Sequence, residues 1–132
     1  MPKLMLSAGA FYALFAVILG AFGAHALKGK LTAEQLNSFS TATDYQFMHA
    51  LALLAVAIIA QVWAAQSIES RLLSYSGYAF IAGTLLFSGS IYLLVLTGIR
   101  HIGPINIALV TPLGGSILII GWALLLAAAL KH

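Results

Sequence analysis

The chain is divided by its charged residues into four long stretches that carry no formal charge. These stretches contain 24, 24, 28 and 30 residues, and they lie between Lys3 and Lys28, Asp44 and Glu69, Arg71 and Arg100, and Arg100 and Lys131. A helix needs roughly 20 residues to cross about 30 Å of hydrocarbon, so each stretch can cross a membrane once but not twice. We therefore predict four transmembrane helices, over residues 4–26, 45–66, 72–98 and 105–130.

The composition excludes most other classes of protein. Hydrophobic residues make up 62% of the 132 positions and charged residues only 7%, whereas soluble domains average near 45–50% and about 25%. Lipid must cover the surface that so few charges cannot solvate, which excludes a water-soluble enzyme and a disordered regulator. The net charge of +3 is too thinly scattered to bind nucleic acid, and without cysteine there is no disulfide or thiolate metal site. We interpret residues 1–132 as a single integral membrane domain.

The connections predict how the spans are arranged. The runs are continuously apolar, which favours helices over the alternating strands of a barrel. The connections near residues 67–71 and 99–104 are short, so consecutive helices must be antiparallel, and an all-α, up-down-up-down bundle follows. Residues 27–44 form the one long connection, in which Thr32-Ala33-Glu34-Gln35 matches a helix capping box. We expect a short interfacial helix to begin there and to run on into the second span.

Two features of the chain leave alternatives open. The first span could instead be a cleaved signal peptide, with Lys3 as its basic region and Ala24-His25-Ala26 as its cleavage site, although its apolar run is longer than such peptides require. Orientation is also undecided. The side that carries the termini and the second connection has three basic residues, as does the opposite side, so the positive-inside rule gives a tie.

Polar side chains gather towards the membrane face at which the first and third connections lie, here called the first-loop face. They come from all four spans and include His25, Tyr45, Gln46, His49, Ser88, Ser90, Tyr92 and Thr111. A polar side chain that faces lipid leaves its donors and acceptors unpaired, so these groups are expected to point into the bundle or into a cavity. The sequence therefore predicts a polar pocket that opens towards the first-loop face.

Two interpretations of this predicted pocket remain. Tyr45 and Gln46 lie four and three residues before His49, which places the three on one helical stripe. The groups could simply be interhelical hydrogen bonds, each contributing about 0.6 kcal/mol in a membrane. Alternatively, they could bind a small polar ligand, a lipid headgroup or a partner helix.

Catalytic, metal and proton-transport chemistry are disfavoured by spacing. Neither His25 nor His49 belongs to a metal-binding histidine pair or an HExxH motif, so no metal or other cofactor is expected. No G-x-S-x-G elbow surrounds Ser88 or Ser90, which argues against a serine hydrolase. A proton-coupled transporter would need a carboxylate in the middle of a span, and we expect all three acidic residues at span edges.

The fourth span contains residues that commonly interrupt helices. Pro112 is followed by Gly114 and Gly115 within Thr111-Pro112-Leu113-Gly114-Gly115. Proline removes a backbone donor, and we predict that the helix kinks or locally unwinds there. Broken transmembrane helices are tolerated where they line a cavity, so the predicted break supports the predicted pocket.

Several of these segments together resemble a known family. They are Leu19–His25, Tyr45-Gln46-x-x-His49, Leu86–Tyr92, Thr111–Gly115 and Gly121-Trp122. This ordered set resembles the YgdD-like family of small four-helix membrane proteins with a domain of unknown function, and the resemblance covers nearly the whole chain. It implies residence in the bacterial cytoplasmic membrane as a multi-pass protein, and it tilts the orientation slightly towards cytoplasmic termini. It carries no reaction, ligand or catalytic residue.

The leading functional hypothesis is a non-enzymatic bundle that binds a small polar ligand, a lipid headgroup or a partner helix through the predicted pocket. The alternative is a small transporter or channel subunit, which would need to form a homo-oligomer because four spans enclose little room.

The predicted position of the pocket, in the half of the bundle nearer the first-loop face, leads to one prediction about bound ligand. Replacing His49 with Leu is expected to disturb ligand retention more than replacing Gln61, because Gln61 lies in the opposite half of the second span. Native mass spectrometry of the full-length protein released from mild detergent measures the retention. Equal ligand retention by the two variants would show that the pocket does not lie in the half of the bundle nearer the first-loop face.

Overall fold

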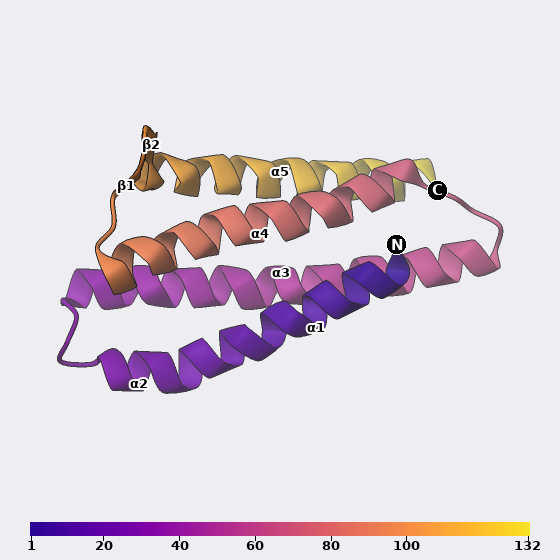
Figure 1. Ribbon diagram of the computed structural model, residues 1–132. Coiled ribbons are helices and arrows are strands. Elements are labelled where there is room, and N and C mark those ends of the chain that lie inside the picture. The colour runs from indigo at the N-terminus through magenta and orange to yellow at the C-terminus, as the bar shows by residue number, and fades with distance from the viewer.

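The computed structural model describes residues 1–132 as four long helical rods that alternate in direction (Figure 1). The first rod, Pro2–Leu27, consists of α1 (Pro2–Ile18), a π-helical turn (Leu19–Gly23) and α2 (Ala24–Leu27). The other rods are α3 (Ala33–Ala65), α4 (Arg71–Thr97) and α5 (Ile107–Lys131). Each rod is long and apolar enough to cross a membrane, which confirms the four predicted spans.

Local hydrogen bonds fix where the rods begin. The Thr32 hydroxyl accepts the Gln35 N–H at 3.1 Å and the Gln35 side chain accepts the Thr32 N–H at 2.9 Å, so the predicted capping box starts α3. The expected interfacial helix therefore forms the first turns of α3, which continues unbroken into the second span. Ser70 caps α4 in the same way, by accepting the Leu73 N–H at 3.3 Å.

The connection from α4 to α5 is short and tightly turned. Gly98 ends α4 with a φ of 70°, a left-handed conformation that glycine adopts without strain. Two short antiparallel strands follow, β1 (His101–Ile102) and β2 (Ile105–Asn106), and the Asn106 side chain then accepts the Ala108 N–H at 3.1 Å to cap α5. This hairpin was not anticipated from the sequence.

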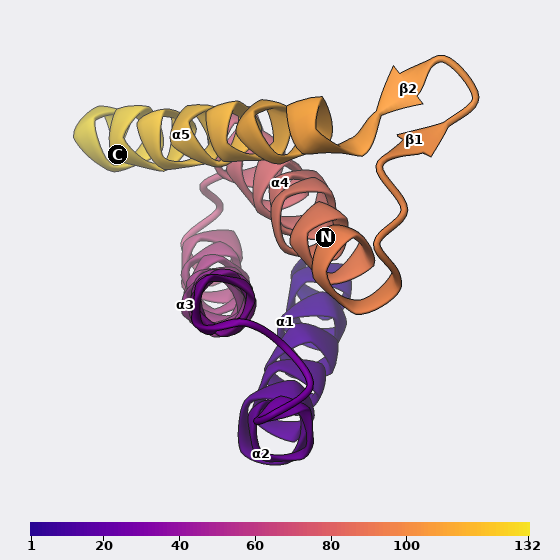
Figure 2. The same cartoon turned by 90° about the vertical axis from the view of Figure 1, so that its left-hand side faces the viewer.

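The rods pack mainly in the order α1, α3, α4, α5, so α1 and α5 are the outer members. Figure 2 looks almost along α3, whereas α5 lies across the view, so α5 is inclined to α3 and only α4 packs extensively against both. Buried side chains at the centre come from all four rods and include Met5, Leu53, Val56, Leu73, Phe80 and Leu118. The open order of packing leaves a seam between α3 and α5.

The local unwinding that was one predicted outcome in the fourth span is not observed. α5 runs without interruption from Ile107 to Lys131 and contains Pro112 within its second turn. Proline removes only its own N–H, so a helix can continue through it when the surrounding turns are held in place. Gly114 has a different role, since a Cβ atom there would collide with the backbone of Phe87 on α4. Glycine at this position therefore lets α4 and α5 pack closely, and it does not unwind α5.

The irregular helix lies instead in the first span. Leu19–Gly23 form a π-helical turn, in which each hydrogen bond reaches one residue further than in an α-helix. Such a turn changes the angular position of every residue that follows it. The sequence analysis did not predict this irregularity.

The contact of Gly114 with α4 can be tested by adding one methyl group. Gly114→Ala is expected to destabilise the protein by about 1–3 kcal/mol, because overpacking forces the two backbones apart. Gly115→Ala is the matched control, since its Cβ atom would lie 3.6 Å from the nearest neighbour, the Phe87 ring, and alanine favours the helix by about 1 kcal/mol. Thermal unfolding in detergent measures both, and equal unfolding temperatures would contradict the close contact.

Candidate functional site

His49 lies at the middle of α3 and is only 2% exposed. The Trp122 indole N–H of α5 donates to its Nε2 atom at 3.1 Å, and its Nδ1 atom lies 2.7 Å from the Tyr45 carbonyl oxygen. An indole can only donate, so Nε2 is the acceptor and Nδ1 carries the proton that is donated to Tyr45. His49 is thus a neutral imidazole with both nitrogen atoms engaged, and it joins α3 to α5.

Gln46 connects three of the four rods. Its amide nitrogen donates to the Tyr12 carbonyl oxygen of α1 at 2.8 Å, and its amide oxygen accepts the Tyr92 hydroxyl of α4 at 2.8 Å. Tyr12 in turn donates its hydroxyl to the Ile81 carbonyl oxygen at 2.8 Å. Gln46 and Tyr92 therefore stabilise the contacts between α1, α3 and α4.

The predicted serine and threonine residues also make hydrogen bonds within the protein. Ser88 donates to the Ala42 carbonyl oxygen of α3 at 2.8 Å. Ser90 donates to the Phe87 carbonyl oxygen at 2.9 Å, and its oxygen lies 2.5 Å from the Thr111 hydroxyl. Because the single Ser90 proton is used on Phe87, Thr111 must donate to Ser90 and so joins α5 to α4.

The eight predicted residues therefore do not line one common pocket. Gln46, Ser88 and Tyr92 lie between α3 and α4, whereas Tyr45 and His49 border the seam between α3 and α5. His25 is exposed near the end of the first rod, whereas His49 is buried at the middle of α3, so the two histidines lie at different depths.

The seam between α3 and α5 contains a groove of about 450 Å³ in the part of the chain expected to lie in hydrocarbon. Its walls are formed by α3 and α5 with Phe87 of α4 between them, and its lining includes Tyr45, Met48, His49, Gly115, Ile119 and Trp122. The Tyr45 and Phe87 rings are stacked with centroids 4.5 Å apart. Its inner end is closed by the hydrogen bond from Trp122 to His49.

A second, polar hollow of about 550 Å³ lies nearer the first-loop face and shares no lining residue with the groove. We call this hollow the mouth. It is lined by the first turns of α3, the end of α4 and the start of α5, and its polar members are Glu34, Gln35, Asn37, Ser38, Thr41, Arg100 and Thr111. The mouth and the groove lie on one stripe of each helix, since Glu34, Ser38, Thr41, Tyr45 and Met48 follow one another at spacings of three and four.

The mouth lies nearer the first-loop face than the groove does, but most of its residues were not among those predicted to form a pocket. Of the predicted residues only Thr111 lines it, while the charged side chains Glu34 and Arg100 were taken as parts of connections. A signal was available: the capping box places residues 33–44 on a helix, and continuing its spacing into the second span puts Glu34 on the stripe of Tyr45.

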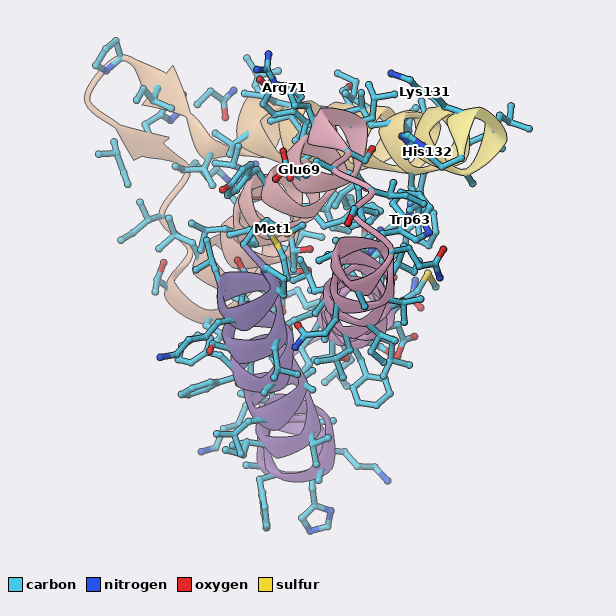
Figure 3. The ribbon with its side chains drawn as sticks, turned by 90° about the vertical axis from the view of Figure 1, so that its right-hand side faces the viewer. Met1, Trp63, Glu69, Arg71, Lys131 and His132 are labelled. Atoms are coloured by element: carbon cyan, nitrogen blue, oxygen red, sulfur yellow. The ribbon has the colours of Figure 1, made fainter.

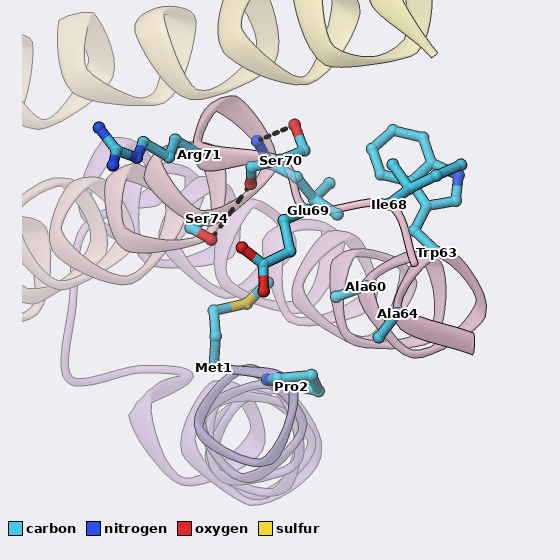
Figure 4. A pocket seen from close by; sticks show the side chains of 11 residues that line it. Met1, Pro2, Ala60, Trp63, Ala64, Ile68, Glu69, Ser70, Arg71 and Ser74 are labelled. Carbon is cyan, nitrogen blue, oxygen red and sulfur yellow. Dashed lines mark hydrogen bonds between the residues drawn. The ribbon is translucent and has the colours of Figure 1, made fainter. Parts of the chain in front are cut away.

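A third hollow, of about 270 Å³, lies at the opposite end of the protein. Figure 3 shows that Met1, Trp63, Glu69, Arg71, Lys131 and His132 gather at this end. Figure 4 shows the Glu69 side chain turned towards Met1 and the Arg71 side chain turned away. The Ser70 and Ser74 hydroxyls are used in the first turn of α4, where Ser74 donates to the Ser70 carbonyl oxygen at 3.3 Å. This hollow was not predicted from the sequence, which placed the polar groups near the first-loop face.

The fold and the site together define the class: a multi-pass integral membrane protein of four transmembrane helices. The chain belongs to the family described as Protein of unknown function (DUF423), whose model matches residues 19–115. A family of unknown function agrees with the resemblance seen in the sequence motifs. No solved structure matches the chain.

Curated relatives match over almost the full length. The chain is 43% identical to a UPF0382 membrane protein of Staphylococcus aureus (strain bovine RF122 / ET3-1), over 98% of this chain and 97% of the relative. It is 42% identical to the UPF0382 membrane protein YwdK of Bacillus subtilis (strain 168), over 98% of each chain. These bacterial relatives are described as membrane proteins, in agreement with the fold.

The hydrogen bond between α5 and α3 can be tested by removing its donor. Trp122→Phe leaves the His49 Nε2 atom without a partner and is expected to cost about 1–3 kcal/mol. Thr84→Val is the control on α4, because the buried Thr84 hydroxyl has no hydrogen-bond partner and its loss is expected to be neutral or stabilising. Thermal unfolding in detergent compares the two variants, and equal losses would contradict the assigned bond.

Proposed function

We propose that this protein binds a phospholipid, with the headgroup in the mouth and one hydrocarbon chain in the groove. The observation that carries the proposal is the change of polarity along one seam. The mouth contains both signs of charge together with amide and hydroxyl groups, whereas the deeper groove is lined mainly by aromatic, methionine and aliphatic side chains, with His49 and Ser116 as its uncharged polar members. A phospholipid has the same order of polarity from the membrane surface inwards.

The chemistry of the mouth favours a zwitterionic headgroup that has N–H donors. Glu34 offers a carboxylate to an ammonium group, and Arg100 offers a guanidinium to a phosphate, for which its planar set of donors is well suited. Asn37 and Ser38 add neutral groups that can bind phosphate or glycerol oxygens. An ethanolamine phospholipid carries both complementary charges in one headgroup.

The groove suits a single hydrocarbon chain. Its Tyr45–Phe87 stack gives one flat apolar wall, and Gly115 leaves space on the α5 side. The Trp122–His49 hydrogen bond closes the inner end, so an occupying chain would enter from the mouth or sideways from the bilayer.

Binding without catalysis is supported by the state of the groups that a reaction would need. His49 uses both ring nitrogen atoms, and the Ser88 and Ser90 hydroxyls donate to backbone carbonyls. A general base must be able to take a proton from its substrate, and a serine nucleophile must be able to give its proton to such a base. Of the groups predicted from the sequence, neither the His49 imidazole nor the Ser88 and Ser90 hydroxyls are therefore free for such a reaction.

The proposal places the protein in the cytoplasmic membrane of a bacterium with both termini in the cytoplasm. It is supported by the bacterial membrane proteins that match the chain and by the family resemblance, while the basic residues remain evenly divided between the two faces.

Lipid binding is tested by native mass spectrometry of the full-length protein incubated with phosphatidylethanolamine, phosphatidylglycerol or phosphatidylcholine. The wild-type protein is expected to retain phosphatidylethanolamine best. Gly115→Leu is expected to abolish retention of all three lipids, because its side chain extends into the groove beside Phe87. Glu34→Gln is expected to remove only the preference for phosphatidylethanolamine.

Gln61→Leu is the matched control, since Gln61 is exposed on α3 outside the seam. It is expected to retain lipid like the wild-type protein. Equal retention by the Gly115→Leu variant and the wild-type protein would contradict the binding site. Retention without preference among the headgroups would leave the groove in place and contradict the role of Glu34.

A further inference from the structure

Asp44 lies outside the seam, on the outer surface formed by α1 and α3. It is exposed and borders a shallow hollow of about 470 Å³. The other lining residues are Ala16, Val17 and Gly20 of the first rod and Thr43, Phe47, Met48 and Leu51 of α3. One carboxylate therefore stands in an otherwise almost entirely apolar, outward-facing hollow.

The midpoints of the rods that border the hollow place it within the depth of the hydrocarbon, whereas the sequence led us to expect all three acidic residues at span edges. The middle of α3 (Ala33–Ala65) is His49, and Asp44 is five residues away, or about 8 Å along the helix. The middle of Pro2–Leu27 falls between residues 14 and 15, so Ala16 and Val17 lie within about 4 Å of it. Both distances are smaller than the half-thickness of hydrocarbon, which is about 15 Å.

A different placement of the bilayer, with Asp44 at the edge of the hydrocarbon, would expose other apolar residues to water. Val17, Ile18 and Phe22 of the first rod are exposed apolar residues at or beyond the level of the hollow. Such a shift would transfer them from lipid to water. The carboxylate is therefore held in lipid by its neighbours.

No cation of this chain is available to Asp44. The six basic residues, Lys3, Lys28, Lys30, Arg71, Arg100 and Lys131, all lie in connections or in the first or last turns of the rods. A phospholipid amine stays at the membrane surface, above the hollow. An ionisable side chain within a membrane is costly unless it is paired, so the missing cation points to a binding partner.

The shape of the hollow suits a helix. Gly20 is exposed and has no side chain, and the small residue Ala16, which is only 4% exposed, lies at the floor of the hollow, so a partner helix can approach the first rod closely here. A Cβ atom at Gly20 would meet no other atom within 4 Å, so this face of the first rod is uncovered. The π-helical turn begins at Leu19, beside Gly20, and π-helical turns are frequent at functional sites.

We propose that this hollow docks a transmembrane helix of another membrane protein that carries one lysine or arginine at the depth of Asp44. The charge of the hollow selects such a helix over an uncharged one. A second copy of this chain does not fit, because it has no basic residue at that depth and a symmetric pair would bring one Asp44 towards the other.

Synthetic peptides and the full-length protein in phosphatidylcholine vesicles test the proposal. The chain has no cysteine, so a single Gln66→Cys substitution provides one site for a fluorophore. The peptides are leucine–alanine helices of roughly 20 residues, with either Lys or Leu about five residues from the middle. Energy transfer to a labelled peptide is expected to show binding that is roughly tenfold tighter for the Lys peptide.

Three variants test whether the preference for the Lys peptide depends on the Asp44 carboxylate. Asp44→Asn is expected to bind the Lys peptide no better than the Leu peptide, and Asp44→Lys is expected to prefer a peptide with Glu at the same position. Glu69→Gln, a change at an exposed acidic residue outside the hollow, is expected to bind like the wild-type protein. Thermal unfolding in detergent confirms that the Asp44 variants fold, and the exchanged preference of Asp44→Lys cannot arise from misfolding.

Three results would overturn the proposal. The first is equal binding of the Lys and Leu peptides by the wild-type protein. The second is self-association of labelled protein that Asp44→Asn abolishes, which would identify a second copy as the occupant. The third is Asp44-dependent binding of tetraphenylphosphonium without preference for the Lys peptide, which would identify a small organic cation.

Discussion

The hydrogen bonds of Gln46 hold the centre of this structure together. In lipid there is no water to satisfy a side-chain amide, so Gln46 must find its partners within the protein. It finds them on two different rods, at the Tyr12 carbonyl oxygen of α1 and the Tyr92 hydroxyl of α4. Because both rods are tied to the same residue of α3, their rotation about their own axes is restricted.

The seam is a consequence of how the fourth rod is attached. α5 packs extensively on α4, where Gly114 allows the backbones to approach, but it reaches α3 through the side chains of Trp122 and His49. A long aromatic–imidazole link keeps the two helices apart and leaves the space between them open towards the first-loop face. The Trp122–His49 contact that closes the inner end of the groove therefore also keeps the space between α3 and α5 open.

The sequence predicted the helices better than it predicted their irregularities. Charge spacing predicted the number of spans, and the capping box at Thr32 and Gln35 located the start of α3. Pro112 does not unwind α5, which stays helical through it. The π-helical turn was missed, since the glycines within Leu19–Gly23 also occur where regular helices pack closely. The candidate site was only partly predictable from the sequence. The residues were identified as polar and deep, but the angular position of each side chain was unknown.

What the sequence determined by itself was a four-span membrane protein, with polar groups that must be satisfied inside it. This follows from the transfer of apolar residues out of water and from the length of helix that crosses hydrocarbon. Only the tertiary structure decided which polar groups are hydrogen-bond partners, which line the seam, and which, such as Asp44, remain unpaired on the outer surface. The physical reason is that burial depends on composition along one helix, whereas a hydrogen bond depends on the relative rotation of two.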